Sequence, residues 1–445
     1  MKKAGMIVSF LVAVFAVVAV SALAYTYLEW EKPQVKIREA FDMIGRKRAV
    51  TVDVADARSG VRSVAVSLVQ KDRTFDVASE EVPGEGVFQK RLAFEVNPRE
   101  LKMHDGPAVL QVKVVDYSPL RNTTVVRRNV TVDMVPLRVS LVSMAHNVNP
   151  GGTCMAAYTL SKPVQQSGVL CGGVFSPGYP QLTKGGKTCY VCYFPVPLDV
   201  SGATVMSVTA SDRAGNKAVA PISFYVRTAW KYNADKLSIT PDFITRKAAE
   251  FVQDWPELEG KGVEEAFTAI NVGIRRQNED TIRKISLKTS PRQLWDGGEF
   301  LMMKNGATRA RFGDRRTYLL DARPIGESLH QGVDVASTGH APVEAANGGV
   351  VLFASNLGIY GNTAIIDHGQ GITTIYSHLS GFQVSEGDQV KKGQVIGTTG
   401  ATGWAGGDHL HVGLLVNGVF VNPIEWWDPH WIRDNVLLKL EDAGA

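Results

Sequence analysis

Two histidines separated by a single residue, His409 and His411, follow a glycine-rich turn in the segment GGDHLHVGLLVNG, residues 406–418. The apolar run after them is typical of a β-strand, in which residues i and i+2 point to the same face. Both imidazole rings are therefore expected to face the same space. Such a pair is either an ordinary polar strand face or half of a metal site.

A second pair of candidate ligands lies in the segment LHQGVDVAS, where His330 and Asp334 are four residues apart. Gly332 and its valine neighbours favour a strand, which would place the imidazole and the carboxylate on one face. Imidazole and carboxylate are good zinc ligands, and catalytic zinc commonly takes three protein ligands and keeps a fourth position for water. The two pairs together predict a zinc site.

A fifth candidate, His378 in the segment TIYSHLS, makes the set larger than an open catalytic site needs. The economical arrangement has three ligands and two unligated histidines that handle protons and stabilise a developing oxyanion. One ring of the pair His409 and His411 would then bind the metal while the other acts on the substrate. Spacing alone does not say which ring does which.

The order of these motifs resembles the lysostaphin-type (LytM-like) zinc endopeptidases, which hydrolyse peptidoglycan peptides. The resemblance covers about residues 300–428 and rests on H-x-x-x-D, then GIYGNTAIIDHGQGITTIYSHLS, then VSEGDQVKKGQVIGTTGATG, then H-x-H. It implies one Zn²⁺ per chain on His330, Asp334 and His411, and it makes His378 and His409 the catalytic pair. It also implies a DD-endopeptidase that cleaves peptide cross-links. The alternative is a catalytically quiet wall-binding module that recruits or activates another hydrolase.

The elements around these motifs belong to a chain of 445 residues, long enough for about three domains of ~150 residues. Its 44% hydrophobic and 21% charged residues are ordinary for a globular protein. A net charge of +4 without a long basic run gives no argument for nucleic-acid binding. The fold class expected is mainly β and multidomain.

The C-terminal part is expected to hold the chemistry. Residues 291–432 form the predicted peptidase domain, a glycine-rich antiparallel β fold. Residues 229–290 form a predicted helical connector, in which Thr240 is the expected N-cap and Pro241 occupies the first helical position. The apolar residues of this connector recur at helical spacing and are expected to be core residues rather than ligands.

The preceding part reads as two tandem immunoglobulin-like β-sandwich domains, residues 33–135 and 136–228. Alternation such as AVTVDVA, with frequent turns, is typical of antiparallel sandwiches. Residues 112–134 resemble residues 207–227, each with a strand, an Asp-led turn containing Asn, and a final strand. Spacing and rigidity are the favoured role, and binding of a protein partner in the envelope is the alternative.

All four cysteines, Cys154, Cys171, Cys189 and Cys192, lie within 39 residues. In an exported chain such an even cluster predicts two disulfides, with three possible pairings. A zinc ribbon is the alternative, but only Cys189 and Cys192 form a C-x-x-C knuckle.

The N-terminus predicts export. Residues 1–30 contain Lys2 and Lys3 followed by residues 6–24, which are uncharged and almost wholly apolar. Nineteen residues approach the ~20 that a membrane-spanning helix needs. An uncleaved signal anchor is preferred over a cleaved signal peptide, for which Ala22-Leu23-Ala24 would serve as the site. The lysines would stay in the cytoplasm, residues 6–24 would sit in the cytoplasmic membrane, and the remainder would lie outside it.

Overall fold

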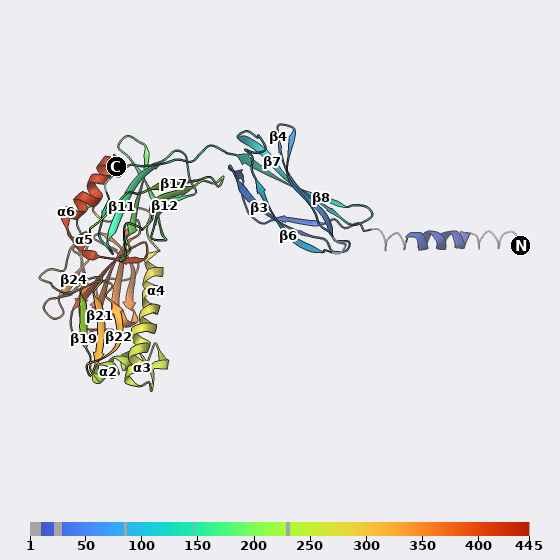
Figure 1. Ribbon diagram of the computed structural model, residues 1–445. Helices are drawn as coiled ribbons and strands as arrows, with labels where there is room; N and C mark the ends of the chain where they lie inside the picture. The colour runs from blue at the N-terminus through green and yellow to red at the C-terminus, as the bar shows by residue number, and fades with distance from the viewer. Residues whose placement is uncertain (1–9, 22–28, 84–86, 145, 228–231, 445) are drawn as a thin grey trace. The chain divides into compact units, whose positions relative to one another are not determined.

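The computed structural model describes residues 10–21, 29–83, 87–144, 146–227 and 232–444 (Figure 1). The chain divides into two compact units. Unit 1 consists of residues 1–137, 162–165 and 211–218, and unit 2 consists of residues 138–161, 166–210 and 219–445. Each unit is built mainly of β-strands.

The predicted membrane segment, residues 6–24, extends at both ends beyond what the structure describes. Residues 10–21 are helical. Within the described part of the chain, no helix has both the length and the apolar character needed to cross a bilayer.

The first sandwich has two sheets around one hydrophobic core. The smaller sheet has the strand order β1 (Gln34–Ile37), β3 (Arg48–Ala55), β6 (Gln89–Val96). The larger sheet has the order β2 (Met43–Ile44), β8 (Thr123–Val132), β7 (Gly106–Asp116), β4 (Val61–Gln70), β5 (Arg73–Glu81). Strand β3 buries Val50, Val52 and Val54 and leaves the residues between them partly accessible, as the alternating sequence predicts.

A second sandwich has two four-stranded sheets. One sheet runs β14 (Tyr179–Leu182), β15 (Thr188–Pro195), β11 (Thr153–Leu160), β9 (Val139–Leu141). The other runs β13 (Val174–Pro177), β12 (Gln166–Cys171), β16 (Met206–Ser211), β17 (Lys217–Pro221). A short parallel pair, β10 (Asn147–Val148) and β18 (Tyr225–Val226), accompanies them. The immunoglobulin-like assignment of the two sandwiches stays a prediction.

The two predicted disulfides are wrong, because all four cysteines are buried free thiols. Cys154, Cys171 and Cys192 lie in the core between the two sheets of the second sandwich. Cys189 is three residues from Cys192 on the same strand, so it points to the opposite face and packs in a different core. Cys189 therefore has no cysteine partner within the chain, and the cluster packs as small apolar side chains.

The predicted helical connector contains four short helical segments and a strand. Its helical parts are α2 (Pro241–Phe251), α3 (Val263–Thr268), η2 (Ala269–Ile274) and α4 (Arg275–Ser286), with a short 3₁₀ turn, η1 (Pro256–Leu258), after α2. Thr240 caps α2 as predicted, since its hydroxyl accepts a hydrogen bond from the backbone N–H of Phe243. The strand β19 (Ala234–Ser238) pairs in parallel with β21 (Arg315–Leu320), which pairs with β22 (Arg323–Leu329).

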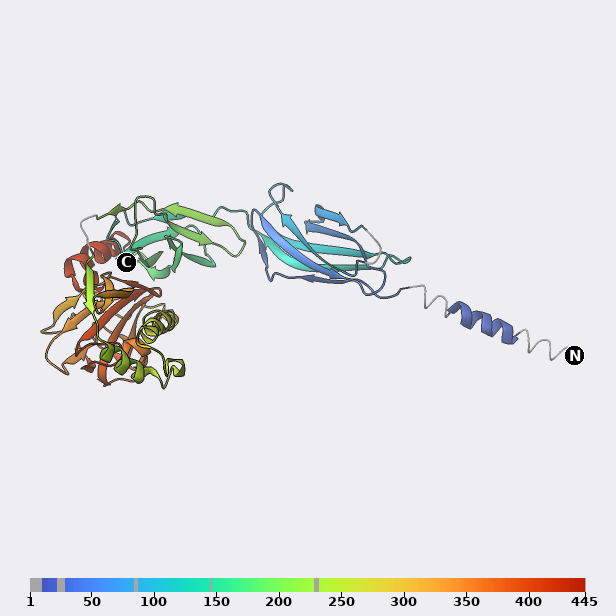
Figure 2. The same cartoon turned by 60° about the horizontal axis from the view of Figure 1, so that its bottom comes forward.

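Helix α4 lies along one side of the C-terminal strands, and α2 and α3 lie at their lower end in Figure 1; Figure 2 shows the same helices from another side. Phe267, Ile270 and Ile274 are buried against residues of those strands, so the apolar stripe is core, as expected. The main C-terminal sheet has the order β20 (Ala307–Ala310), β23 (Val333–Ala336), β30 (Leu410–Val416), β27 (Ile372–Phe382), β26 (Asn362–Gly369), β25 (Gly349–Asn356), β28 (Gln389–Val390). Strands β24 (Pro342–Glu344), β29 (Val395–Thr399) and β31 (Val419–Val421) extend it.

The second sandwich and the C-terminal domain share a hydrophobic core within unit 2. Tyr193 of β15 is fully buried, with its ring centroid 5.9 Å from that of Trp426 and 6.5 Å from that of Trp295. The indole N–H of Trp426, on α5 (Pro423–Trp427), donates to the hydroxyl of Thr153 on β11 at 3.0 Å. The chain ends in α6 (Pro429–Ile432), η4 (Arg433–Leu437) and α7 (Leu438–Asp442). These two parts therefore pack as one body.

Candidate metal centre

Adjacent strands bring the candidate ligands together. Asp334 on β23 is the register partner of His411 on β30, and Ser377 on β27 is the partner of His411 on its other side. His378 follows with a left-handed backbone, φ 63°, a costly conformation that recurs at functional sites. His330 was expected within the same strand as Asp334. It instead lies in the loop between β22 and β23, so the chain turn, rather than strand periodicity, aims its ring.

Three side-chain atoms converge on one point. His411 Nδ1 lies 2.8 Å from Asp334 Oδ1, His330 Nε2 lies 3.0 Å from the same oxygen, and the two ring nitrogens are 3.1 Å apart. The residues are 4%, 8% and 5% exposed for His330, Asp334 and His411. A buried group of two imidazoles and one carboxylate has the donor set and the mutual proximity of a zinc site with three protein ligands.

Hydrogen bonds orient the first of these rings. His330 Nδ1 is 2.9 Å from the carbonyl oxygen of Arg311, so the proton belongs on Nδ1 and Nε2 carries the free lone pair. On the other ring, His411 Nε2 is buried without a hydrogen-bond partner among the described residues. With its Nδ1 directed at Asp334 and His330, that ring presents a lone pair to the shared point. The residues therefore fit a metal ion.

The electrostatics of the three groups also fit a cation. Burial alone would raise the pKa of Asp334, but His330 and His411 outweigh it, and this pKa lies well below its ordinary value. Burial lowers the pKa of His411 to about 4, although Asp334 opposes the shift. Asp334 is therefore anionic and His411 neutral at neutral pH, which are the protonation states that metal ligands require.

His378 and His409 face the same space without joining the three ligands. Their ring centroids are 4.8 Å apart, and His409 Nε2 lies 3.7 Å from Asp334 Oδ1. His378 Nδ1 is 2.8 Å from the carbonyl oxygen of Thr402, and His409 Nδ1 is 2.8 Å from that of Gly407. Both rings thus donate Nδ1–H to a backbone carbonyl and turn Nε2 away from the backbone.

Burial, followed by the neighbouring His409 and His411, holds the pKa of His378 well below its ordinary value. A neutral imidazole with a fixed Nδ1–H can accept a proton at Nε2, which is what a general base needs. The structure therefore brings all five sequence-predicted residues together and divides them into a group of three and a pair.

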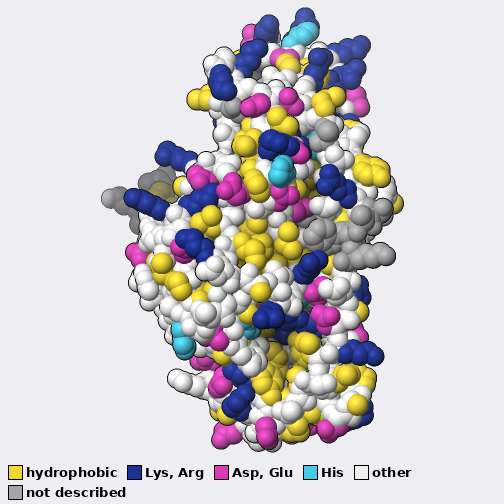
Figure 3. Space-filling view, turned by 90° about the vertical axis from the view of Figure 1, so that its left-hand side faces the viewer, with side chains coloured by type: hydrophobic (Ala, Val, Ile, Leu, Met, Phe, Trp, Pro, Cys, Tyr) yellow, Lys and Arg dark blue, Asp and Glu magenta, His cyan; other side chains and the backbone are white. Residues whose placement is uncertain are grey.

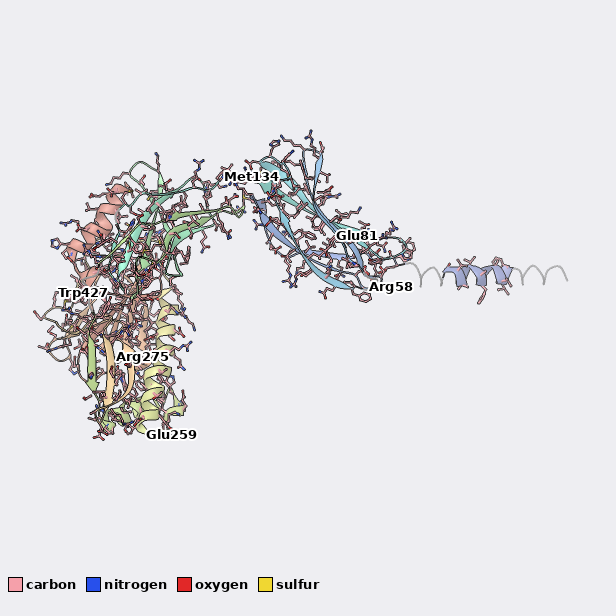
Figure 4. All side chains as sticks on the ribbon, viewed as in Figure 1. Arg58, Glu81, Met134, Glu259, Arg275 and Trp427 are labelled. Carbon is pink, nitrogen blue, oxygen red and sulfur yellow. The ribbon has the colours of Figure 1, made fainter. Side chains whose placement is uncertain are left out.

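The site opens into a cavity of about 440 Å³ whose walls come partly from outside the C-terminal motifs. Arg275 of α4, which Figure 4 labels, lines it together with Phe243 of α2 and Arg316 of β21. Arg316 donates a hydrogen bond to Asp334 Oδ2 at 2.7 Å. No sequence signal points to these residues, because their spacing does not indicate that β19, α2 and β21 pack beside the site. Tyr360, in the segment GIYGN, also lies beside the site, with its ring centroid 5.7 Å from that of His411.

Position 332, just before β23, has no room for a side chain because β30 lies against it. A Cβ there would lie 2.5 Å from the carbonyl oxygen of Val412 and 2.7 Å from two ring atoms of His411. Real Cβ atoms do not approach this closely, so any side chain would move the His411 ring.

On the face shown in Figure 3, acidic side chains lie among basic ones, in keeping with the small net charge. Exposed hydrophobic side chains are distributed between them.

Comparisons with known proteins agree on the C-terminal domain. Residues 328–423 match the family model of peptidase family M23. The DD-carboxypeptidase/endopeptidase Mpg of Neisseria meningitidis is 45% identical over 96 residues, and the peptidoglycan DD-endopeptidase ShyA of Vibrio cholerae is 41% identical over 96 residues. Each match covers 22% of this chain and 22% of the relative, so the chain spans about a fifth of the length of these curated relatives.

Among solved structures, the catalytic domain of the antimicrobial peptidase lysostaphin from Staphylococcus simulans is 30% identical, with a TM-score of 0.24. The match covers 28% of this chain and 92% of that structure. Peptidases of family M23 are zinc metallopeptidases, and a buried His-Asp-His group that could hold a metal ion is present in this chain. The chain is a mainly β protein that carries, in its C-terminal part, a zinc peptidase domain of family M23.

Proposed function

We propose that this protein is a zinc-dependent endopeptidase that cleaves peptide cross-links of peptidoglycan, most simply as a DD-endopeptidase. The observation that carries the proposal is the convergence of His330, Asp334 and His411 beside two histidines whose Nε2 atoms are free. The names of the relatives, a DD-carboxypeptidase/endopeptidase and a peptidoglycan DD-endopeptidase, support the substrate class.

In this proposal His330, Asp334 and His411 would hold the zinc ion. When bound, zinc polarises the substrate carbonyl and lowers the pKa of a water molecule toward ~7. His409 Nε2, the closer of the pair to Asp334, is placed to accept the proton of the attacking water. His378, neutral and held by the Thr402 carbonyl, is placed beside it as the second proton acceptor, and the member of the pair that has taken up the proton would stabilise the developing oxyanion and protonate the leaving amine.

Two basic side chains in the cavity suit a substrate that carries carboxylates. Arg275 is held by two hydrogen bonds to Asn271, through its backbone and side-chain oxygens at 3.1 and 3.0 Å. Arg316 is partly accessible while it pairs with Asp334. Stem peptides end in carboxylates, and guanidinium groups bind carboxylates with directional, charge-assisted hydrogen bonds.

We further propose that the peptidase domain acts outside the cytoplasmic membrane, with the N-terminus in the cytoplasm. Support comes from the sequence alone: two lysines precede the apolar residues 6–24, which would serve as the anchor or export signal. The two sandwiches would then space the peptidase domain from the membrane. A protein partner of the sandwiches in the envelope is the other role they could have.

Digestion of purified sacculi tests the proposed activity. Zinc-loaded protein is expected to convert cross-linked muropeptides into monomers, and the variant His409→Ala is expected to be slower by about 10²–10⁴-fold. The matched control is His430→Ala, an exposed histidine in the C-terminal helices. Unchanged cross-linking with the zinc-loaded protein, together with full function of His409→Ala in cells, would favour the quiet module that recruits another hydrolase.

A further inference from the structure

Three acidic side chains meet at one end of the first sandwich, inside unit 1. Glu29 precedes β1, Asp56 follows β3 and Asp116 ends β7. One oxygen from each carboxylate lies within 4.8 Å of one from each of the others. The three residues are only 4%, 5% and 0% exposed, respectively. Arg58, labelled in Figure 4, marks the β3–β4 turn at this end of the unit.

The hydrogen bonds made to this cluster do not satisfy all of its carboxylate oxygens. Ser59 N–H donates to Glu29 Oε2 at 3.1 Å, and both the N–H and the hydroxyl of Ser118 donate to Asp116 Oδ1. Glu29 Oε1 and Asp116 Oδ2 are buried with no hydrogen-bond partner among the described residues. Burying an anionic oxygen without a partner costs free energy. Buried charges in proteins are therefore usually paired with an opposite charge or bound to a metal ion.

Among the described residues, no ion pair joins a lysine or arginine to this cluster of Glu29, Asp56 and Asp116. Three carboxylates thus crowd together in a region of low dielectric, where like charges repel strongly. A cation at their centre would reduce this repulsion and would be coordinated by the oxygens that lack hydrogen-bond partners.

In the second sandwich, the side chain of Lys162 lies at the position that corresponds to this acidic cluster of the first sandwich. Lys162 Nζ lies 2.9 Å from Asp133 Oδ2 and 2.6 Å from Asp212 Oδ2, so an ammonium group bridges two carboxylates. Asp212 stands where Asp116 stands in the first repeat. In each case the aspartate N–H donates to the carbonyl oxygen of the asparagine that closes the same turn, Asn216 and Asn122 respectively.

The strand register shows which residue of the first sandwich corresponds to Lys162 of the second. Gln34 pairs with Ala55 at the start of β1, and Val139 pairs with Leu160 at the start of β9. Counting two residues past the second strand gives Ala57 in the first repeat and Lys162 in the second. The first sandwich therefore has Ala57 at the position of Lys162, and the third carboxylate, Asp56, is next to that position in the sequence.

We propose that Glu29, Asp56 and Asp116 bind a calcium ion. The donor set consists of oxygens alone, which suits a hard cation and not zinc or copper. Three carboxylates in a cluster formed by separate turns allow the large and variable coordination shell of Ca²⁺, completed by water or backbone oxygens. Bound calcium would tie the segment before β1 to the β3–β4 and β7–β8 turns, and so stiffen the start of the first sandwich.

Calcium titration of the purified full chain, with zinc already bound, tests the proposal. Wild-type protein is expected to bind one Ca²⁺ with a Kd of about 10⁻⁴–10⁻³ M, the range of extracellular modules, and to melt at a higher temperature when calcium is present. Asp116→Asn keeps the shape of the side chain but removes a charge. This variant is expected to bind calcium at least about 10-fold more weakly and to lose the melting shift.

Two further variants make the test specific. Asp72→Asn, an exposed aspartate in the β4–β5 turn of the same unit, is the matched control and should respond like wild type. Ala57→Lys places an ammonium where the second repeat has one, and should melt high without calcium and show no calcium response. No binding of Ca²⁺ by wild type at about 10 mM, or an equal loss in Asp72→Asn, would overturn the site. Equally tight binding of Mg²⁺ would overturn the assignment to calcium. None of these outcomes bears on the peptidase activity.

Discussion

The rings of His409 and His411 sit two residues apart and face one space, yet their surroundings differ. His411 directs Nδ1 at Asp334 and His330, whereas His409 uses Nδ1 to bind the carbonyl of Gly407. His411→Ala should therefore lose zinc together with activity, because two remaining protein ligands hold zinc poorly. His409→Ala should keep near-stoichiometric zinc and lose turnover. Metal analysis by mass spectrometry of both purified variants decides this, and a zinc-free His409→Ala beside a loaded His411→Ala would reverse the roles.

Gly332 carries no chemistry but decides where His411 can lie. Gly332→Ala is expected to displace the His411 ring, to reduce zinc content severalfold and to abolish most activity, because its Cβ would overlap the ring and a backbone oxygen. The matched control is Gly406→Ala, where nothing lies within 4 Å of the added Cβ. Zinc content and rate are the measurements, and a fully loaded, active Gly332→Ala would contradict the steric argument.

At the scale of elements, the short helix α5 connects the peptidase domain to the second sandwich through Glu425. This carboxylate is buried and accepts hydrogen bonds from Asn149 Nδ2 at 2.6 Å and from the N–H of Thr153 at 2.7 Å. Burial raises its pKa from the ordinary 4.5 to about 7, although both hydrogen bonds oppose the shift. The folded state thus keeps a proton that the unfolded state has already released.

The sign of the effect follows from that proton. As pH rises from about 4.5 to about 7, the folded state binds more protons than the unfolded state, so the free energy of unfolding falls, by an amount on the order of 3 kcal/mol over the whole window. Glu425→Gln should remove this part of the pH dependence, while Glu441→Gln, an exposed residue on α7, should keep it. Denaturant unfolding at pH 5 and pH 8 measures the difference. Equal pH slopes for Glu425→Gln and wild type would contradict the assignment.

At the scale of the whole molecule, the second sandwich is a structural part of the peptidase domain. Tyr193→Ala should lower the free energy of the unfolding transition that releases zinc by about 3–5 kcal/mol, because its ring packs on Trp426 and Trp295. Tyr225→Ala, at a tyrosine that is 67% exposed, is the control. Calorimetry that shows zinc release unaffected by Tyr193→Ala would mean that the two parts fold independently.

The five site residues of the C-terminal third could be predicted from the sequence, because ligand chemistry is local and the order of the motifs resembles a known family. Strand periodicity, however, wrongly placed His330 in the strand of Asp334. The N-cap at Thr240 was local too. The contacts of Arg316 with Asp334 and of Tyr193 with Trp426 could not be predicted, since they join residues 18 and more than 200 positions apart and depend on packing. The disulfide prediction failed for a related reason: an even cysteine count carries no information on which sheet face each thiol occupies.

The central claim is that His330, Asp334 and His411 hold a zinc ion that supports hydrolysis of a peptide cross-link. A purified muropeptide dimer joined by a D-alanyl–diaminopimelate bond tests it most directly, with products followed by mass spectrometry. The zinc-loaded protein should yield two monomers, chelation should stop the reaction, and added zinc should restore it. An intact dimer after prolonged incubation with fully zinc-loaded protein, or cleavage that persists without zinc, would contradict the account.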